Sequence, residues 1–182
     1  MIAVAVGNRN DLRERTRLKS LTAESCGSLQ PLCTNHFTIV DQGIPFSLFE
    51  LSEKNFERKE GEKGKKFELY EPPTDPFSSL NEDPKLIIGD AGNSHKHLLN
   101  KFNVLKDHTL LITKKFQPQE GPLTAEDLKV LYQNVVELPA VGFYNSGPIS
   151  GASQRHRHMQ LVPCDALPAH NSHHFSSTLD KL

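Results

Sequence analysis

The chain has 182 residues, with 21 basic and 22 acidic side chains and a formal net charge of −1. This length is enough for one domain with a sizeable core, and the balanced charge does not indicate a general affinity for nucleic acid or membrane surfaces. No apolar run is long enough to span a bilayer. The three cysteines (Cys26, Cys33 and Cys164) form no close pair, which favours free thiols in a reducing compartment. A cytoplasmic protein is expected.

The first half of the chain predicts one helix, one hairpin and a long irregular connection. Residues 9–25 are expected to be helical, with leucines that are only loosely periodic. Strands are expected at 36–40 and 44–51, because their apolar residues alternate on either side of a short turn that contains glycine. A charged run at 53–66 is typical of an exposed loop. The proline-rich connection at 71–84 could cross the surface towards a binding cleft.

The second half predicts a sheet and one well-defined helix. Strands are expected at 85–90, 97–104, 108–115, 141–145 and 156–163. Thr124 is expected to cap the helix, since Asp127 follows three residues later and Pro139 stops the apolar pattern. The predicted apolar face consists of Leu128, Leu131, Val135 and Leu138. This order of elements predicts an α+β fold, a mostly antiparallel sheet with packed helices. Residues 1–165 are expected to form the domain and 166–182 a polar, flexible tail.

The stretch YNSGPISGASQRHRHMQLVP, residues 144–163, carries the strongest chemical signal. Side chains two positions apart share one face of a strand, so His156, His158 and Gln160 are expected to point the same way. The loop before them, SGPISGAS, can expose successive backbone N–H groups, which suit an anion such as phosphate. A neutral imidazole is a good nucleophile near pH 7, and this pairing indicates transfer of a phosphoryl or nucleotidyl group.

A metal site is the alternative interpretation of the paired histidines. His156 and His158 could bind zinc if His170 and His174 of the HNSHH segment supplied further ligands. The HKH segment, with His95 and His97, has the same spacing but no adjacent Gly/Ser loop. We expect this second pair to lie on the surface at a strand edge, without a catalytic part.

NSGPISGASQRHRHMQLVP closely resembles the active-site signature of the diadenosine tetraphosphate phosphorylases, also called ATP adenylyltransferases. They belong to the histidine-triad superfamily, and its transferase branch has His-x-His-x-Gln where the hydrolases have a third histidine. HLLNKFNVLKDHTLLIT resembles the block that forms the nucleoside side of the pocket in that family. The resemblance covers most of residues 10–163 and implies a histidine-triad-like fold.

The resemblance also implies a role for each matched residue. His158 would be the nucleophile that attacks the α-phosphorus and becomes adenylylated, and His156 would help to orient the site. Gln160 would contact the phosphate or the leaving group. Asn100 would bind ribose hydroxyls, although it lacks the carboxylate of the hydrolases, and Lys101 would lie near the phosphates or in solvent. The α-phosphate pocket would be lined by Asn145, Gly151, Ser153 and Gln154.

The implied reaction converts diadenosine tetraphosphate and inorganic phosphate into ATP and ADP through an AMP-histidine intermediate. The expected partners are therefore ATP, ADP, diadenosine polyphosphates and phosphate, with no nucleic acid and no membrane. No tightly bound cofactor is expected, and a divalent cation such as Mg²⁺ would come with the nucleotide. A homo-oligomer is compatible with the sequence.

Two alternative functions must be considered, the first because this sequence differs from the family pattern. Family members carry a C-terminal part of the fold that is missing here, since this chain ends shortly after the signature. The chain is thus either an adenylyltransferase or a truncated, non-catalytic nucleotide-binding fragment. A histidine-triad dinucleotide hydrolase is the other alternative, which Gln160 disfavours because a neutral amide cannot serve as a general acid or base.

Overall fold

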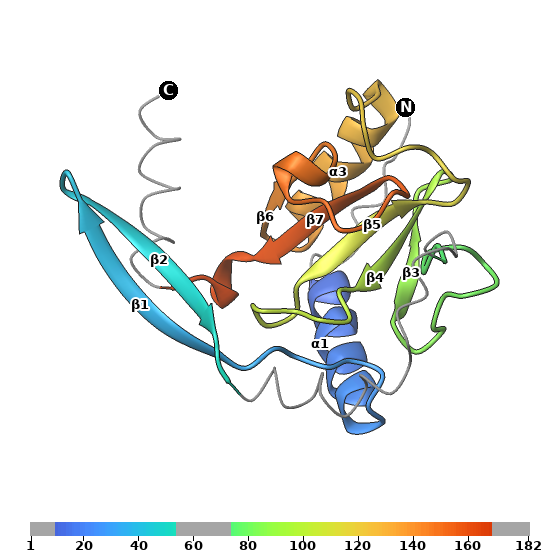
Figure 1. The fold of residues 1–182 in the computed structure, drawn as a ribbon. Helices are drawn as coiled ribbons and strands as arrows, with labels where there is room; N and C mark the ends of the chain where they lie inside the picture. The colour runs from blue at the N-terminus through green and yellow to red at the C-terminus, as the bar shows by residue number, and fades with distance from the viewer. Residues whose placement is uncertain (1–9, 54–73, 169–182) are drawn as a thin grey trace, which may run out of the picture.

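The computed structural model describes residues 10–53 and 74–168 (Figure 1). Its helices are α1 (Asn10–Ser25) and α3 (Ala125–Glu137), with single 3₁₀ turns at Pro148–Ser150 and Cys164–Ala166. Its strands are β1 (Thr34–Asp41), β2 (Ile44–Leu51), β3 (Ile87–Ala91), β4 (His95–Leu99), β5 (Thr109–Thr113), β6 (Ala140–Phe143) and β7 (His158–Pro163). The predicted charged loop lies almost wholly outside the described residues, as does most of the predicted tail. None of the described helices is long and apolar enough to cross a membrane.

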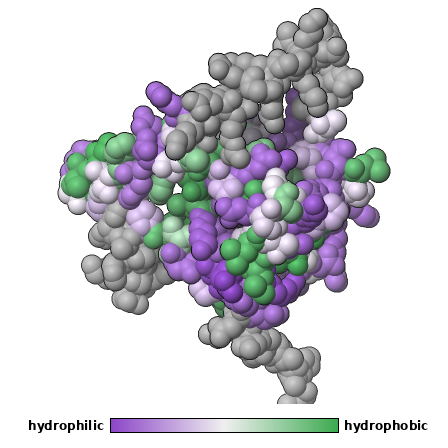
Figure 2. All heavy atoms as spheres, turned by 90° about the horizontal axis from the view of Figure 1, so that it is seen from below, coloured by the Kyte–Doolittle hydropathy of each residue, from purple (hydrophilic) through white to green (hydrophobic). Residues whose placement is uncertain are grey.

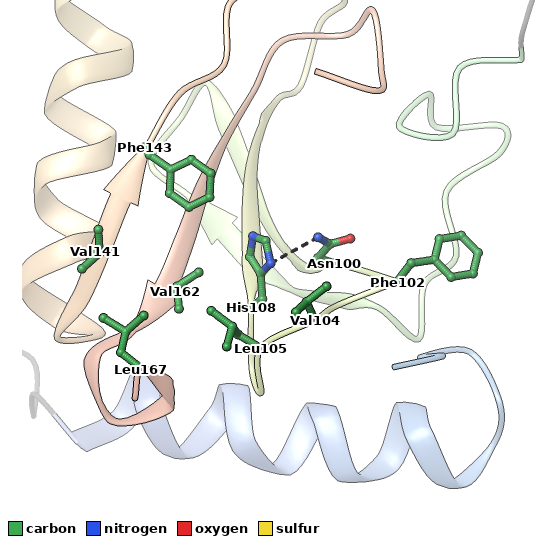
Figure 3. Close-up of a pocket in the computed structure, with 9 residues that line it drawn as sticks. All are labelled: Asn100, Phe102, Val104, Leu105, His108, Val141, Phe143, Val162 and Leu167. Atoms are coloured by element: carbon green, nitrogen blue, oxygen red, sulfur yellow. Dashed lines mark hydrogen bonds between the residues drawn. The ribbon is translucent and has the colours of Figure 1, made fainter. Parts of the chain in front are cut away.

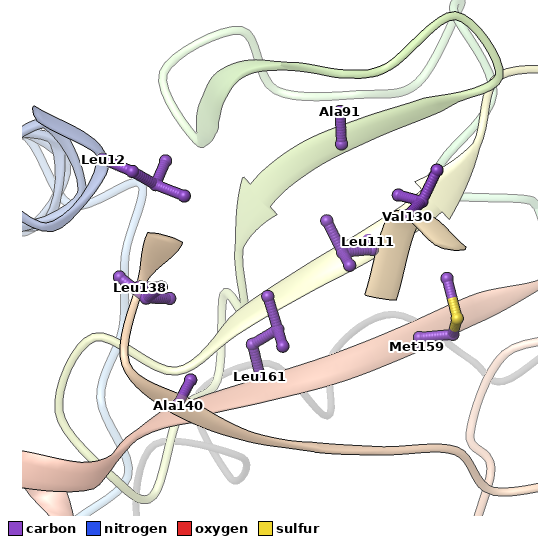
Figure 4. Packing of buried hydrophobic residues seen from close by; sticks show 8 residues of the cluster. All are labelled: Leu12, Ala91, Leu111, Val130, Leu138, Ala140, Met159 and Leu161. Carbon is purple, nitrogen blue, oxygen red and sulfur yellow. The ribbon is translucent and has the colours of Figure 1, made fainter. Parts of the chain in front are cut away.

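The main sheet has five antiparallel strands in the order β3-β4-β5-β7-β6, so the predicted α+β class is confirmed. One face packs against both helices. Leu12 of α1 and Val130 of α3 lie in the same buried cluster as Leu111, Met159 and Leu161 of the sheet (Figure 4). The opposite face carries a smaller cluster, in which Phe77 packs on Leu98, Leu110 and Ile112. Because strand side chains alternate, His158 and Gln160 lie on this second face.

Helix α1 was expected with loosely periodic leucines, and its contacts explain that pattern. Leu18 and Leu21 are half exposed, whereas Thr16 and Ser20 are buried. The Thr16 hydroxyl donates to the carbonyl of Leu12, four residues earlier. Burial therefore costs little for this small polar side chain, since its hydrogen bond is made within the helix.

The predicted start of α3 is confirmed, and its predicted apolar face is partly wrong. Thr124 and Asp127 form a reciprocal capping box. Leu128 is 53% exposed, whereas Asp127 and Val130 are buried. The buried face therefore begins at Asp127, one residue before the predicted Leu128. The apolar pattern missed this position because a charged residue occupies it. The ion pairs of Asp127, described below, make that burial tolerable.

The predicted hairpin is confirmed as β1 and β2, joined by Gln42 and Gly43. Both turn residues have positive φ, 47° and 80°, which matches the right-handed twist of a two-residue hairpin. The hairpin forms a sheet of its own and projects from the domain, and Figure 2 shows apolar surface on it. Its apolar face stays 45–59% exposed and consists of Phe37, Ile39, Ile44, Phe46 and Leu48.

Three predicted strand boundaries near the site are wrong. The strand expected at 97–104 begins at His95 and ends at Leu99, because the next residues turn away and bond elsewhere. The carbonyls of Lys101 and Asn103 accept hydrogen bonds from the backbone N–H groups of Gln30 and Leu32. The strand expected from residue 156 begins at His158, and His156 forms only an isolated bridge with Pro118.

Candidate functional site

The histidines of the predicted signature lie together on the second face of the sheet, opposite the face that packs against the helices. The ring of Phe77 lies 5.9 Å from that of His156 and 5.4 Å from that of His158, measured between centroids. Both histidines are more than nine-tenths buried. Phe77 belongs to the proline-rich connection, which therefore does run to this site.

The backbone fixes the tautomer of His158. Its Nδ1 lies 2.8 Å from the carbonyl oxygen of His156. Because a carbonyl can only accept, Nδ1 must carry the proton, and Nε2 of the neutral ring keeps its lone pair. Burial lowers the pKa of His158 below its ordinary value, although the hydrogen bond to the carbonyl opposes this shift. The ring is thus neutral near pH 7, with one nitrogen ready to attack an electrophile.

His156 is held from both ring nitrogens. Nδ1 lies 2.8 Å from Oδ2 of Asp75, and Nε2 lies 2.7 Å from the carbonyl oxygen of Thr113. An ionised carboxylate and a carbonyl both accept, so this geometry suits an imidazolium that donates twice. Neither nitrogen is free to bind zinc. The described residues contain no group of three or more metal-binding side chains, and His170 and His174 lie outside them.

A cavity of about 290 Å³, lined by both polar and apolar side chains and called the polar cavity below, lies in front of His158. Gln160 lines it from β7, and Asn100 and Lys101 line it from the end of β4. The glycine-rich loop closes another side through Gly151, Ser153 and Gln154. The fold therefore brings together seven of the nine residues that the sequence assigned to the site. Of the other two, His156 lines a neighbouring cavity with Ser153 and Gln154.

The ninth residue, Asn145, lies behind the loop. Its side-chain nitrogen is 3.6 Å from the position that a Cβ would take at Gly151. Its carbonyl accepts a hydrogen bond from the side chain of Gln119 at 2.7 Å. Within the described residues Asn145 therefore supports the loop and does not line either polar cavity.

The loop differs from the predicted row of free N–H groups. Gly147 and Gly151 have φ values of 81° and 94°, which glycine adopts readily. These turns close the chain on itself, and the N–H groups of Ser150, Gly151 and Ala152 all donate to carbonyls within the loop. Any anion would therefore be met mainly by the residues that follow, Ser153 and Gln154.

An apolar cavity of about 320 Å³ adjoins the polar one (Figure 3). Asn100 and Phe102 border both cavities. His108 lies between Phe143 and Asn100, whose side-chain nitrogen is 3.3 Å from Nδ1 of the imidazole. Burial lowers the pKa of His108 to about 4, so this ring is neutral. Together the two cavities suit a molecule with a flat apolar end and a polar end. The remaining lining residues are Val104, Leu105, Val141, Val162 and Leu167.

The predicted surface position of His95 and His97 is wrong. Each is only 1% exposed, because β4 is an interior strand of the five-stranded sheet. Nε2 of His97 lies 2.8 Å from the hydroxyl oxygen of Thr109, and burial lowers the pKa of His97 to about 3. The equal spacing of the two His-x-His pairs gave no sign that one faces the core.

A buried charge cluster anchors the histidine strand to α3. One carboxylate oxygen of Asp127 lies 3.0 Å from Nε2 of His95, and the other accepts from Arg157 at 3.0 Å. The second oxygen also accepts from the backbone N–H of Thr124. Arg157 lies between the two site histidines in the sequence, so the helix start fixes the strand that carries them.

Sequence reasoning missed Asp75, Phe77 and Gln119. Asp75 and Phe77 lie in a stretch dominated by prolines and polar residues, where no periodic pattern singles them out. Asp75 is 81 residues from His156, and Gln119 is 39 residues from His158. Such contacts depend on the sheet topology. A buried glutamine in a loop has no local signature.

The fold and the site define an α+β protein in which a histidine-bearing strand and a glycine-rich loop enclose a divided cavity. The chain matches the Ap4A phosphorylase N-terminal domain over residues 4–180, where Ap4A is diadenosine tetraphosphate. It belongs to this family.

Two of the relatives that this chain resembles are yeast proteins. Diadenosine tetraphosphate phosphorylase 2 of Saccharomyces cerevisiae is 37% identical over 102 residues, which cover 48% of this chain and 31% of the relative. Protein APA1 of the same yeast is 40% identical over 98 residues, with 48% and 30% covered.

Solved structures of yeast Ap4A phosphorylase Apa2 have the same fold. The complex with AMP superposes with a TM-score of 0.66 at 27% identity, and covers 84% of this chain and 50% of Apa2. The complex with Ap4A gives a TM-score of 0.67 at 27% identity, with 84% and 51% covered. The chain thus spans about half the length of Apa2.

Proposed function

We propose that this chain carries the nucleotidyl-transfer site of an Ap4A phosphorylase, which converts Ap4A and phosphate into ATP and ADP. The observation that carries the proposal is the fixed tautomer of His158, whose unprotonated Nε2 belongs to a neutral, buried ring lining the polar cavity. One yeast relative named above is a diadenosine tetraphosphate phosphorylase, and yeast Ap4A phosphorylase Apa2 has been solved in complex with AMP and with Ap4A. We extend these ligands to the present chain.

In this proposal the two joined cavities divide one nucleotide between them. The adenine base lies in the apolar cavity, where the rings of Phe102 and Phe143 supply apolar contact. Asn100, which borders both cavities, binds the ribose hydroxyls. The α-phosphate then lies in the polar cavity before His158, with Ser153 and Gln154 as donors and Lys101 as a nearby cation.

The reaction proceeds in two displacements at the α-phosphorus. Nε2 of His158 forms a bond to phosphorus while the bond to the bridging oxygen breaks, and ATP leaves. An oxygen of inorganic phosphate then attacks the AMP-histidine, the nitrogen–phosphorus bond breaks, and ADP forms with His158 restored.

The neighbouring side chains support these steps without taking protons from the nucleophile. Gln160 donates an amide hydrogen bond to a phosphate oxygen or to the leaving group. His156, whose Nδ1 is bonded to Asp75, helps to orient the site from the neighbouring cavity. No tightly bound cofactor is needed, and Mg²⁺ would accompany the polyphosphate as part of the substrate.

The alternative is a nucleotide-binding fragment without turnover, which the half-length match to Apa2 keeps open. Incubation with Ap4A, with and without phosphate, separates the two. We expect phosphate-dependent release of ATP and ADP, abolished by His158→Ala and retained by His36→Ala, which changes an exposed histidine of the hairpin. Release of AMP without phosphate would instead indicate a hydrolase. Binding of Ap4A without any turnover would favour the fragment.

A further inference from the structure

Strands β6 and β7 separate at the histidine that we propose as the nucleophile. Their last paired residues are Phe143 and Gln160. Continued pairing would place Asn145 opposite His158, but β6 ends at Phe143 and the chain enters the glycine-rich loop. On the side of β7 that faces β6, the backbone N–H and C=O of His158 therefore have no strand partner.

The side chain of Gln119 occupies this gap. Its Oε1 accepts from the backbone N–H of His158 at 2.7 Å. Its Nε2 donates to the carbonyl of His158 at 3.1 Å and to the carbonyl of Asn145 at 2.7 Å. One amide group thus satisfies both backbone groups of His158 and joins them to the start of the loop, using its acceptor and both its donors.

Gln119 is itself held firmly. Its side chain is buried, with the residue only 3% exposed. Its backbone N–H donates to the carbonyl of Arg155 at 2.8 Å, and its carbonyl accepts from the hydroxyl of Tyr144. The residue is therefore fixed both by the segment that leads into β7 and by the segment that leaves β6.

We propose that Gln119 is a positioning residue for nucleotidyl transfer. This role rests on the function proposed above. Its amide takes the place of the missing strand and sets the position of His158 relative to the loop residues that face the α-phosphate. A transfer reaction depends on this placement, because a shift of about 1 Å in a reacting group lowers the rate by about 100-fold.

The variant Gln119→Met tests the role, since methionine has a similar length and makes none of these hydrogen bonds. We expect kcat for Ap4A phosphorolysis to fall by about 10- to 100-fold while the KM for Ap4A changes by less than about threefold. The matched control is Gln133→Met on the exposed side of α3, which keeps wild-type kinetics. Wild-type kcat in Gln119→Met would overturn the proposal.

Two further measurements keep the test independent of folding and of the proposed activity. Tyr144→Phe removes the hydroxyl bonded to the Gln119 carbonyl, and we expect a smaller loss of kcat in the same direction. Hydrogen exchange of the His158 backbone amide is expected to be faster in Gln119→Met than in Gln133→Met. Unchanged exchange would contradict the positioning of His158 by the Gln119 amide, even if the wild-type chain shows no turnover. An absence of turnover in the wild-type chain would count against the proposed function alone.

Discussion

At the scale of single residues, the two signature histidines have different surroundings, which suit them to the different roles proposed above. His158 has one nitrogen bound to a carbonyl, whereas both nitrogens of His156 are engaged. A nucleophile needs a lone pair, which only His158 keeps. The spacing could predict that the two share a face, but it could not rank them by hydrogen bonding.

Asp75 is the residue that we expect to matter most for His156. Asp75→Asn exchanges the carboxylate, whose Oδ2 lies 2.8 Å from Nδ1, for a neutral amide and so weakens the hydrogen bond that orients the His156 ring. We expect kcat/KM for Ap4A phosphorolysis to fall by about tenfold or more. Asp90→Asn is the matched control, because this exposed carboxylate pairs only with Lys114 among the partners described. Equal kcat/KM in the two variants would show that His156 does not depend on its carboxylate.

At the scale of elements, the helix cap and the histidine strand form one unit. Asp127 caps α3, pairs with Arg157 and accepts from His95. The capping box was predictable from Thr124 and Asp127, since that signal is local. The strands were predictable from alternation. The burial of a carboxylate, a guanidinium and an imidazole was not, because each is tolerated only through partners on other elements.

The variant Asp127→Asn tests this unit. It leaves the buried Arg157 without its counter-charge, and we expect the free energy of unfolding to fall by about 3–5 kcal/mol. Thr124→Ala removes only the cap and is expected to cost about 1 kcal/mol. Urea denaturation measures both. Glu126→Gln, at an exposed neighbouring position, is the control and should change stability by less than about 0.5 kcal/mol. A loss in Asp127→Asn no greater than that in Thr124→Ala would contradict the account.

At the scale of the whole molecule, burial of neutral histidines ties stability to pH. Burial lowers the pKa of His97 to about 3 and that of His108 to about 4, against an ordinary value of 6.5. Both rings stay neutral in the folded chain and become protonated in the unfolded chain below pH 6.5. Stability is therefore fully present above that pH and declines as the pH falls towards these lowered values.

Between pH 7.5 and 5.5 we expect these two histidines together to lower the free energy of unfolding by about 2.8 kcal/mol, since each contributes about 1.4 kcal/mol. Urea denaturation at the two pH values measures this change. His97→Gln can keep a hydrogen bond to Thr109 and cannot titrate, so its loss should be smaller by about 1.4 kcal/mol. An identical pH dependence in His97→Gln and the wild-type chain would show that His97 does not contribute.

In the proposed reaction, His158 carries AMP between the two half-reactions. The direct measurement uses Ap4A labelled at the α-phosphate, without inorganic phosphate, followed by alkaline quenching and mass spectrometry of the digested chain. We predict AMP bound to His158 by an acid-labile, alkali-stable phosphoramidate bond, which is lost with formation of ADP when phosphate is added. Phosphorolysis without any label on the protein, or label on another residue, would contradict the account.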